Sequence, residues 1–146
     1  MTDYSEVEIL LIEDDPNDVE LTLRVLKKNN FSNAIKVLND GEDALDYIYC
    51  KGKYEGNIHA RPKFILLDLK LPKIDGLDVL KELKNNPETK TIPIVVLTSS
   101  KEEKDRIMSY DLGVNSFIVK PVDFDQFVDA VAHIGYYWML LNQNPS

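Results

Sequence analysis

The sequence predicts an α/β protein built on a parallel sheet. Short apolar runs alternate with segments in which apolar residues recur every three or four positions, and this alternation is typical of βαβ units. Several of the apolar runs are followed directly by acidic or polar residues. A length of 146 residues suits one domain with its own core. We therefore expect residues 1–146 to form a single domain.

Five apolar runs of four to six residues are the predicted strands. They cover residues 7–12, 34–38, 64–68, 92–97 and 116–119. Runs that are apolar at nearly every position indicate strands buried on both faces, as in parallel sheets. Helices are therefore expected on both sides of the sheet.

The predicted helices lie between these strands. They cover residues 16–30, a segment from 42 onward, 77–86, 101–112 and a last segment after 123. Asp15 can cap the first helix and Asp123 the last, while Gly113 suits the position after the fourth. The last helix has an apolar stripe that includes Phe124 and Phe127. Residues 51–62 form a loop longer than the ~2–6 residues usual in such units.

The composition excludes several classes of function. A net charge of −8 and a pI near 4.7 argue against a nucleic-acid surface, which needs clustered basic residues. No apolar run approaches the ~20 residues that span a bilayer, and residues 1–8 lack a basic signal-peptide start. We expect a cytoplasmic protein. Cys50 is the single cysteine, so an internal disulfide is impossible.

Chemically active side chains converge where the predicted strands end. Glu13 and Asp14 follow the first strand, Asp68 ends the third, Thr98 follows the fourth and Lys120 follows the fifth. Ligands of open parallel sheets bind outside the carboxyl ends of the strands. We therefore expect these five side chains to share one site.

Three carboxylates in one pocket repel each other, by about 4 kcal/mol for two charges ~4 Å apart near a surface. The cluster is tolerable if one acid is protonated or if a hard divalent cation takes the oxygens as ligands. Mg²⁺ fits, because it binds through one or two carboxylates and bridges to phosphate oxygens. No loop resembles a calcium-binding EF-hand, and two histidines are too few for a zinc site.

Four sequence blocks carry a resemblance to the response-regulator receiver family. Asp68 and Thr98 are 30 positions apart, and Thr98 and Lys120 are 22 apart, which is similar to single-domain chemotaxis regulators. The blocks are Ile9–Pro16, Leu66–Pro72, Val96–Ser99 and Phe117–Pro121. The order, type and spacing of these residues match together across nearly the whole chain.

The resemblance implies a doubly wound, flavodoxin-like (βα)5 fold with strand order 2-1-3-4-5. It implies that Asp68 is the phosphoacceptor and that Mg²⁺ is held by Glu13, Asp14, Asp68 and the backbone carbonyl of Lys70. Such a protein is not an enzyme in the ordinary sense, although it promotes its own phosphotransfer and dephosphorylation. Asp15, beside the acidic pair, is interpreted as the helix cap rather than a third ligand.

The resemblance also assigns a switch. Thr98 and Lys120 would contact the phosphoryl oxygens, and Phe117 occupies the aromatic switch position. When the Thr98 hydroxyl turns to the phosphate, Phe117 can fill the space it leaves, so that a local charge event changes a surface. Lys120–Pro121 resembles the family's cis peptide bond.

The resemblance implies a sensor histidine kinase as partner. The opening Asp15-Pro16-Asn17-Asp18, the long 51–62 loop and the C-terminal sequence are most similar to regulators paired with phytochromes, so a phytochrome kinase is expected. Residues 135–141 are rich in aromatic and aliphatic side chains. They either cover the core or, with the fifth strand and the last two helices, contribute to a homodimer interface.

Two alternatives stay open at this point. A phosphatase of the haloacid-dehalogenase type also forms an aspartyl phosphate on a parallel sheet, but it needs a second acid where this chain has Lys70. A receiver-like scaffold that never takes a phosphoryl group is the other alternative, although every residue of the site is present.

Overall fold

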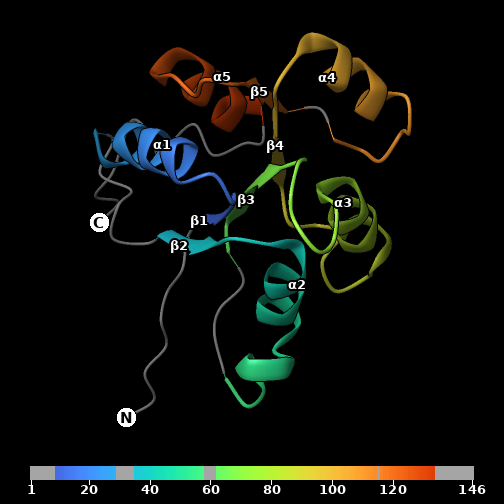
Figure 1. Cartoon of the computed structure of the whole chain (residues 1–146). Coiled ribbons are helices and arrows are strands. Elements are labelled where there is room, and N and C mark those ends of the chain that lie inside the picture. The colour runs from blue at the N-terminus through green and yellow to red at the C-terminus, as the bar shows by residue number, and fades with distance from the viewer. Residues whose placement is uncertain (1–8, 29–34, 58–61, 115, 134–146) are drawn as a thin grey trace, which may run out of the picture.

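The computed structural model describes residues 9–28, 35–57, 62–114 and 116–133, and these contain five strands alternating with helices (Figure 1). The strands are β1 (Ile9–Ile12), β2 (Ile35–Leu38), β3 (Phe64–Asp68), β4 (Ile94–Thr98) and β5 (Phe117–Val119). The helices are α1 (Pro16–Lys28), α2 (Gly41–Tyr49), the short 3-10 helix η2 (Gly52–Tyr54), α3 (Gly76–Asn85), α4 (Lys101–Met108) and α5 (Phe124–His133).

The strands form one parallel sheet in the order β2-β1-β3-β4-β5. This is the predicted flavodoxin-like order, and it is confirmed. The register pairs Ile12 of β1 with Leu67 of β3, and Asp68 with Leu97 of β4. Because all strands run the same way, their carboxyl ends lie along one edge of the sheet.

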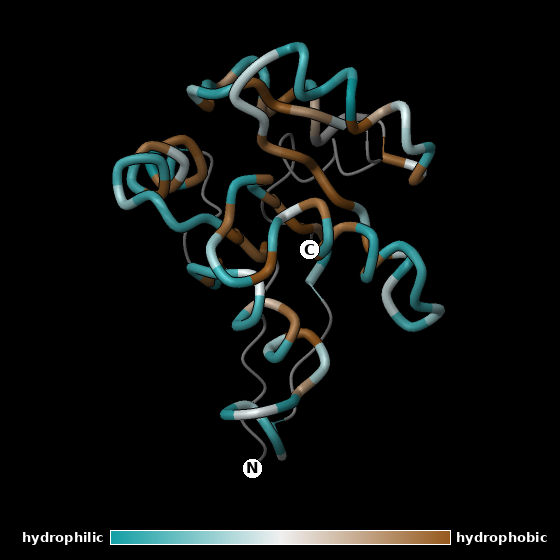
Figure 2. Tube along the Cα trace, turned by 45° about the vertical axis from the view of Figure 1, so that its right-hand side comes forward, coloured by the Kyte–Doolittle hydropathy of each residue, from teal (hydrophilic) through white to brown (hydrophobic). Residues whose placement is uncertain are grey.

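The two faces of the sheet are covered by different helices. Leu10 and Ile12 of β1 belong to a buried cluster with residues of α2, α3 and α4, while Ile9 and Leu11 belong to a second cluster with residues of α1 and α5. Alternate side chains of a strand point to opposite faces, so each strand contributes to both clusters. In Figure 2 the central strands are accordingly hydrophobic and the outer helices carry the hydrophilic residues.

The predicted helix caps are confirmed at both ends of the described chain. Asp15 Oδ1 accepts a hydrogen bond from the backbone N–H of Asn17 at 2.8 Å, at the start of α1. Asp123 Oδ1 accepts one from the N–H of Gln126 at 2.9 Å, at the start of α5. A short acidic side chain satisfies an N–H that has no partner within the helix. Asp15 is therefore bound to the helix terminus, as predicted.

Several predicted boundaries were wrong. The fourth helix ends at Met108 and not at residue 112, because the following N–H groups bond three residues back and Asp111 then adopts a left-handed conformation (φ 52°). Gly113 therefore lies in the next loop instead of directly after the helix. The fourth strand begins at Ile94, since Pro93 has no N–H for the ladder.

The prediction that Phe124 and Phe127 belong to an apolar stripe of the last helix was also only partly correct. Phe127 is fully buried and lies 6.4 Å from the ring of Phe64 on β3, whereas Phe124 is 51% exposed. The predicted loop of residues 51–62 contains η2 in its described part. The segment 135–141, for which an internal or an interface position was expected, lies outside the described residues. Among those that are described, no helix has the length and apolar character needed to cross a membrane.

Candidate phosphoacceptor site

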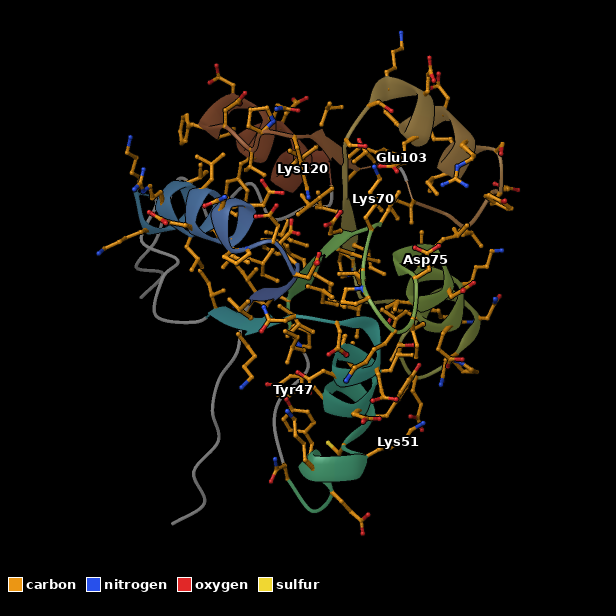
Figure 3. All side chains as sticks on the ribbon, in the orientation of Figure 1. Tyr47, Lys51, Lys70, Asp75, Glu103 and Lys120 are labelled. Carbon is orange, nitrogen blue, oxygen red and sulfur yellow. The ribbon has the colours of Figure 1, made fainter. Side chains whose placement is uncertain are left out.

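Four strands bring their polar residues to the same edge of the sheet, as the sequence predicts. Glu13 follows β1 directly, Asp68 is the last residue of β3, Thr98 is the last of β4 and Lys120 follows β5. Figure 3 labels Lys120 and Lys70 at this edge, with Glu103 nearby at the start of α4. The parallel topology therefore assembles the site from residues that are far apart in the sequence.

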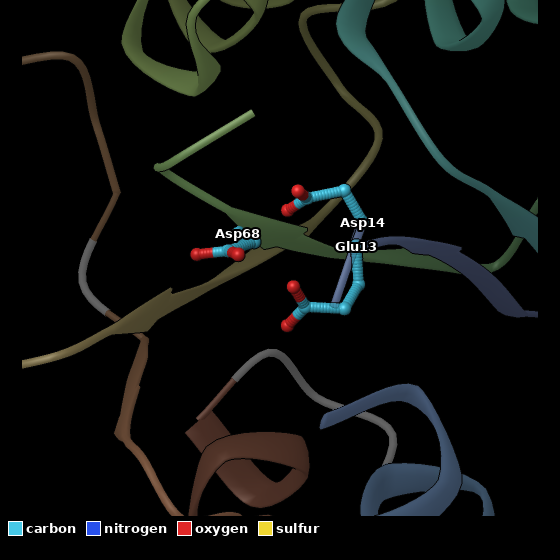
Figure 4. Close-up of side chains that lie close together, drawn as sticks. All are labelled: Glu13, Asp14 and Asp68. Atoms are coloured by element: carbon cyan, nitrogen blue, oxygen red, sulfur yellow. The ribbon is translucent and has the colours of Figure 1, made fainter. Parts of the chain in front are cut away.

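Three acidic side chains form the centre of the site. Oxygen atoms of Glu13, Asp14 and Asp68 all lie within 4.8 Å of one another (Figure 4). Glu13 and Asp68 are buried, and Asp14 is exposed to solvent. Clustered carboxylate oxygens with one open side are the donor set of a hard divalent cation that keeps part of its water shell. The cluster can hold such a cation.

Lys120 is the cation that this structure places against the acids. Its Nζ atom lies 2.8 Å from Glu13 Oε1, 2.9 Å from Asp18 Oδ2 and 3.0 Å from Asp68 Oδ2. The lysine side chain is 19% exposed, so these contacts are poorly screened by solvent. Lys120 thus offsets part of the repulsion among the carboxylates.

Burial and mutual contacts shift the pKa values of these groups. Burial, together with contact with Asp68, raises the pKa of Glu13 to about 8, although Lys120 acts in the opposite direction. Partial burial by itself would lower the pKa of Lys120, but its contacts with Glu13, Asp18 and Asp68 outweigh that effect and hold the pKa above its usual value. The acid cluster therefore favours a protonated Glu13 whenever no other cation neutralises it.

The raised pKa of Glu13 predicts how stability depends on pH. Between the ordinary value of 4.5 and about 8, the unfolded chain releases a proton that folded Glu13 retains, so the free energy of unfolding falls as pH rises. The contribution of Lys120, whose folded pKa is raised, is constant in this window because both of its states are protonated there. Glu13→Gln should therefore lose less stability than wild type between pH 5 and pH 8, by at least about 1 kcal/mol. Urea unfolding in the presence of a chelator measures this difference, and equal losses in the two proteins would contradict it.

Thr98 provides a buried hydroxyl at the same edge. Its side chain is fully buried, and its Oγ1 atom has no hydrogen-bond partner among the described residues. An unsatisfied buried hydroxyl costs about 1–3 kcal/mol and is rare in folded proteins. The atom is therefore free to bond to an incoming group with acceptor oxygens.

Phe117 lies one strand away, on the α4 side of the sheet. It is half-buried, packs against the α2–α3–α4 cluster and has the Nζ atom of Lys104 5.5 Å from the centre of its ring. A cation over the ring face stabilises this position. Phe117 is thus in contact with α4 through Lys104, and its role as a switch residue stays a prediction.

The loop after β3 is held close to Asp68. The backbone N–H of Lys70 donates to Asp68 Oδ1 at 3.3 Å, and the N–H of Gly76 donates to the Leu69 carbonyl at 2.9 Å. A Cβ atom on Gly76 would lie 2.3 Å from the carbonyl oxygen of Asp68, closer than real atoms approach. Only glycine allows α3 to begin this close to the strand end. A ligand role for the Lys70 carbonyl stays a prediction.

A side chain of α5 fixes the segment that carries Lys120. Gln126 Oε1 accepts from the N–H of Val119 at 2.9 Å, and its Nε2 donates to the carbonyls of Val119 and Pro121 at 2.9 and 3.2 Å. The Lys120–Pro121 peptide bond is cis, as the resemblance implied. Gln126 could not be predicted as part of the site, because a half-buried glutamine on a helix has no distinctive sequence pattern.

Asp18 also belongs to the site, although the sequence does not predict it there. The segment Asp15-Pro16-Asn17-Asp18 carries only the family resemblance, yet the Asp18 carboxylate is one of the three that contact Lys120. The two residues are 102 positions apart, so no local pattern could indicate the contact.

The strand order and the acids clustered at the carboxyl edge of the sheet are those expected of a receiver-type signalling module. Comparison with known proteins gives the family. Residues 9–132 match the response regulator receiver domain, and the chain belongs to that family. Receiver domains of response regulators are generally not enzymes in the ordinary sense. The family match decides against the phosphatase alternative.

Three relatives are particularly similar. The response regulator Rcp1 of Synechocystis sp. is 42% identical over 131 residues, which are 90% of this chain and 88% of Rcp1. The structure of the Mn²⁺-bound form of Rcp1 superposes with a TM-score of 0.70 at 38% identity. The superposition covers 94% of this chain and 96% of that one. The bacteriophytochrome response regulator AtBRR gives a TM-score of 0.87 at 50% identity, over 94% and 99% of the two chains. The phosphorylated cyanobacterial phytochrome response regulator RcpA gives 0.71 at 38%, over 94% and 95%.

Proposed function

We propose that Asp68 accepts a phosphoryl group and that the modified protein signals by changing what its surface binds. The observation that carries this proposal is the approach of Lys120 Nζ to within 3.0 Å of Asp68 Oδ2, beside the clustered oxygens of Glu13 and Asp14. Asp68 is almost fully buried, yet one side of its cluster is open through the exposed Asp14. A small phosphorylated donor or a phosphohistidine side chain can therefore reach it.

The chemistry follows from the placement of these groups. A carboxylate oxygen of Asp68 forms a bond to phosphorus while the bond from phosphorus to the donor atom breaks, and the donor leaves with that electron pair. The product is an acyl phosphate on Asp68. Lys120 and the Thr98 hydroxyl donate to the phosphoryl oxygens, where negative charge is concentrated. Later attack of water on phosphorus restores Asp68 and releases phosphate, a step that the same residues promote.

We propose Mg²⁺ as the cation of this site. Glu13, Asp14 and Asp68 would hold it, together with the backbone carbonyl of Lys70. The bound cation supplies positive charge that neutralises the phosphoryl oxygens. The donor set is all oxygen, which suits Mg²⁺ and Mn²⁺ alike, and the relative Rcp1 has been crystallised in a Mn²⁺-bound form.

The switch would run from Thr98 to Phe117. The Thr98 hydroxyl lacks a partner in the described structure and can turn to a phosphoryl oxygen. Phe117 can then move inward into the space that the hydroxyl leaves, releasing its contact with Lys104. A change of this kind alters the α4–β5 surface, where Met108 and Tyr110 are exposed apolar side chains.

The partner that phosphorylates Asp68 is proposed to be a sensor histidine kinase, and specifically a phytochrome. Support comes from the relatives, because AtBRR is a bacteriophytochrome response regulator and RcpA a phytochrome response regulator. We further propose that residues 1–146 act as one cytoplasmic receiver unit. The chain matches nearly the whole length of AtBRR and most of Rcp1, which supports this proposal.

Acetyl phosphate tests the phosphoacceptor proposal without any kinase. Incubation of the purified protein with acetyl phosphate and Mg²⁺ should produce a singly phosphorylated species, visible by intact mass and by phosphate-affinity electrophoresis. Omission of Mg²⁺ or addition of a chelator should suppress it. A protein that stays unmodified in the presence of acetyl phosphate and Mg²⁺ would contradict the phosphoacceptor proposal and support the scaffold alternative.

A homodimer through β5 and the last two helices is the second proposal. The exposed large apolar side chains of the described residues are Met108 at the end of α4, Tyr110 just after it and Phe124 at the start of α5, which are 50%, 44% and 51% exposed. Apolar side chains grouped at a surface can mark an interface. Beryllofluoride, a phosphoryl mimic, should shift the sedimentation coefficient towards that of a dimer. Met108→Lys should weaken the dimer about tenfold or more, because it puts a charge into an apolar contact. A monomer with and without beryllofluoride would contradict the proposal.

A further inference from the structure

The side chain of Asp18 links helix α1 to the phosphoacceptor site. Asp18 is the third residue of α1, and its Oδ2 atom lies 2.9 Å from Lys120 Nζ. The Asp18 side chain is 33% exposed, whereas those of Glu13 and Asp68 are 0% and 6% exposed. Lys120 therefore lies between two buried acids on the inside and one acid near the solvent.

The three acids that contact Lys120 have different roles in the proposed site. The ammonium group of lysine has three N–H donors, and three carboxylates surround it here. Asp68 is the proposed phosphoacceptor, and Glu13 belongs to the proposed cation site. Asp18 is not among the acids whose oxygens lie within 4.8 Å of one another. It is thus on the lysine side of the site and has no place in the cation cluster.

Phosphorylation would change two of the three contacts. Asp68 becomes an acyl phosphate with fewer free carboxylate oxygens, and Glu13 turns to the bound cation. The contact with Asp18 involves neither the phosphoryl group nor the cation, so it can persist through the reaction. Lysine has a flexible four-carbon stem and is poorly positioned unless something holds its end.

We propose that Asp18 is a positioning residue, which holds the Lys120 ammonium over Asp68 from helix α1 while the other two acids change partners. This inference rests on the proposed phosphoacceptor function. It assigns to the first turn of α1 a role in phosphoryl transfer that acts entirely through Lys120. A charge-assisted hydrogen bond of this kind accounts for about tenfold in affinity or rate.

The test uses the 146-residue chain with Mg²⁺ and beryllofluoride. Calorimetry measures the affinity for the mimic, and acetyl phosphate gives the rate of phosphorylation. Asp18→Asn should weaken beryllofluoride binding about tenfold and slow phosphorylation by a similar factor. Asp18→Glu keeps the charge and should recover most of the loss. The matched control is Glu20→Gln, which removes the same charge from an exposed position of α1 and should change both values less than about twofold.

A double-mutant cycle separates positioning from a general effect of charge or folding. In a Lys120→Gln background, Asp18→Asn should cause no further loss of beryllofluoride affinity, because its action requires the ammonium. Thermal unfolding of each variant is measured as well, to show whether a loss of binding reflects a loss of folding. An equal loss in both backgrounds would overturn the positioning role, and so would an Asp18→Asn protein that binds as tightly as wild type. A wild-type protein that neither binds the mimic nor takes a phosphoryl group would instead refute the proposed function itself.

Discussion

Asp68→Asn is expected to abolish phosphorylation by acetyl phosphate while leaving the protein folded. The amide replaces the attacking carboxylate oxygen with a poor nucleophile, so the rate should fall by about 10³-fold or more. The side chain keeps its size, and its amide oxygen can still accept from Lys120, which lies 3.0 Å from Asp68 Oδ2. Intact mass after incubation with acetyl phosphate and Mg²⁺ measures the loss.

Asp75→Asn is the matched control for this experiment. Asp75 is exposed, precedes α3 at the same edge of the molecule and has no side-chain hydrogen bond to the helix start (Figure 3). Its variant should be phosphorylated like wild type. Phosphorylation of Asp68→Asn at the wild-type rate would mean that another residue is the acceptor.

Gly76→Ala is expected to damage both stability and phosphorylation. The added Cβ would lie 2.3 Å from the Asp68 carbonyl oxygen and 2.5 Å from the Leu69 Cα, and all of these neighbours are backbone atoms that cannot turn aside. Either the helix or the end of β3 must move, at a cost of about 3 kcal/mol in the free energy of unfolding. Movement of β3 displaces Asp68 from Lys120, so the phosphorylation rate should fall as well.

Gly113→Ala separates this steric effect from the loss of glycine's backbone freedom. Gly113 has a left-handed φ of 78°, and a Cβ added there would meet no atom within 4 Å. Alanine at this position should therefore cost about 1–2 kcal/mol without affecting the site. Urea unfolding and the acetyl phosphate rate are measured for both variants. If Gly76→Ala is phosphorylated at the wild-type rate, the close packing of α3 does not position Asp68.

The parts of the site that could be predicted from sequence are those fixed by strand ends. Asp68, Thr98 and Lys120 each end or follow a continuous apolar run, and parallel topology alone then brings them together. Contacts made by helix side chains could not be predicted in this way. Asp18 and Gln126 reach the site from α1 and α5, and their positions depend on how each helix packs on the sheet.

Helix ends illustrate a second limit of the sequence. Asp15 and Asp123 were predicted as caps, because a short acid before an apolar periodic segment satisfies the first N–H groups of a helix. The end of α4 was predicted four residues too late. There, Asp111 adopts the left-handed conformation that the sequence suggested for Gly113, and both residues have positive φ. Asp111 and Gly113 are both candidates for the left-handed residue that ends the helix, and only the surrounding packing decides between them.

The separate apolar clusters on the two faces of the sheet have a consequence for what a partner meets on each side of the molecule. In β5, Phe117 packs with the α2–α3–α4 cluster, while its neighbour Ile118 is buried in the α1–α5 cluster. A rotation of Phe117 therefore rearranges one cluster and leaves the other in place. On the proposal that Phe117 is the switch, a partner that contacts α1 would meet the same surface in both states, whereas a partner that contacts α4 would meet a changed one.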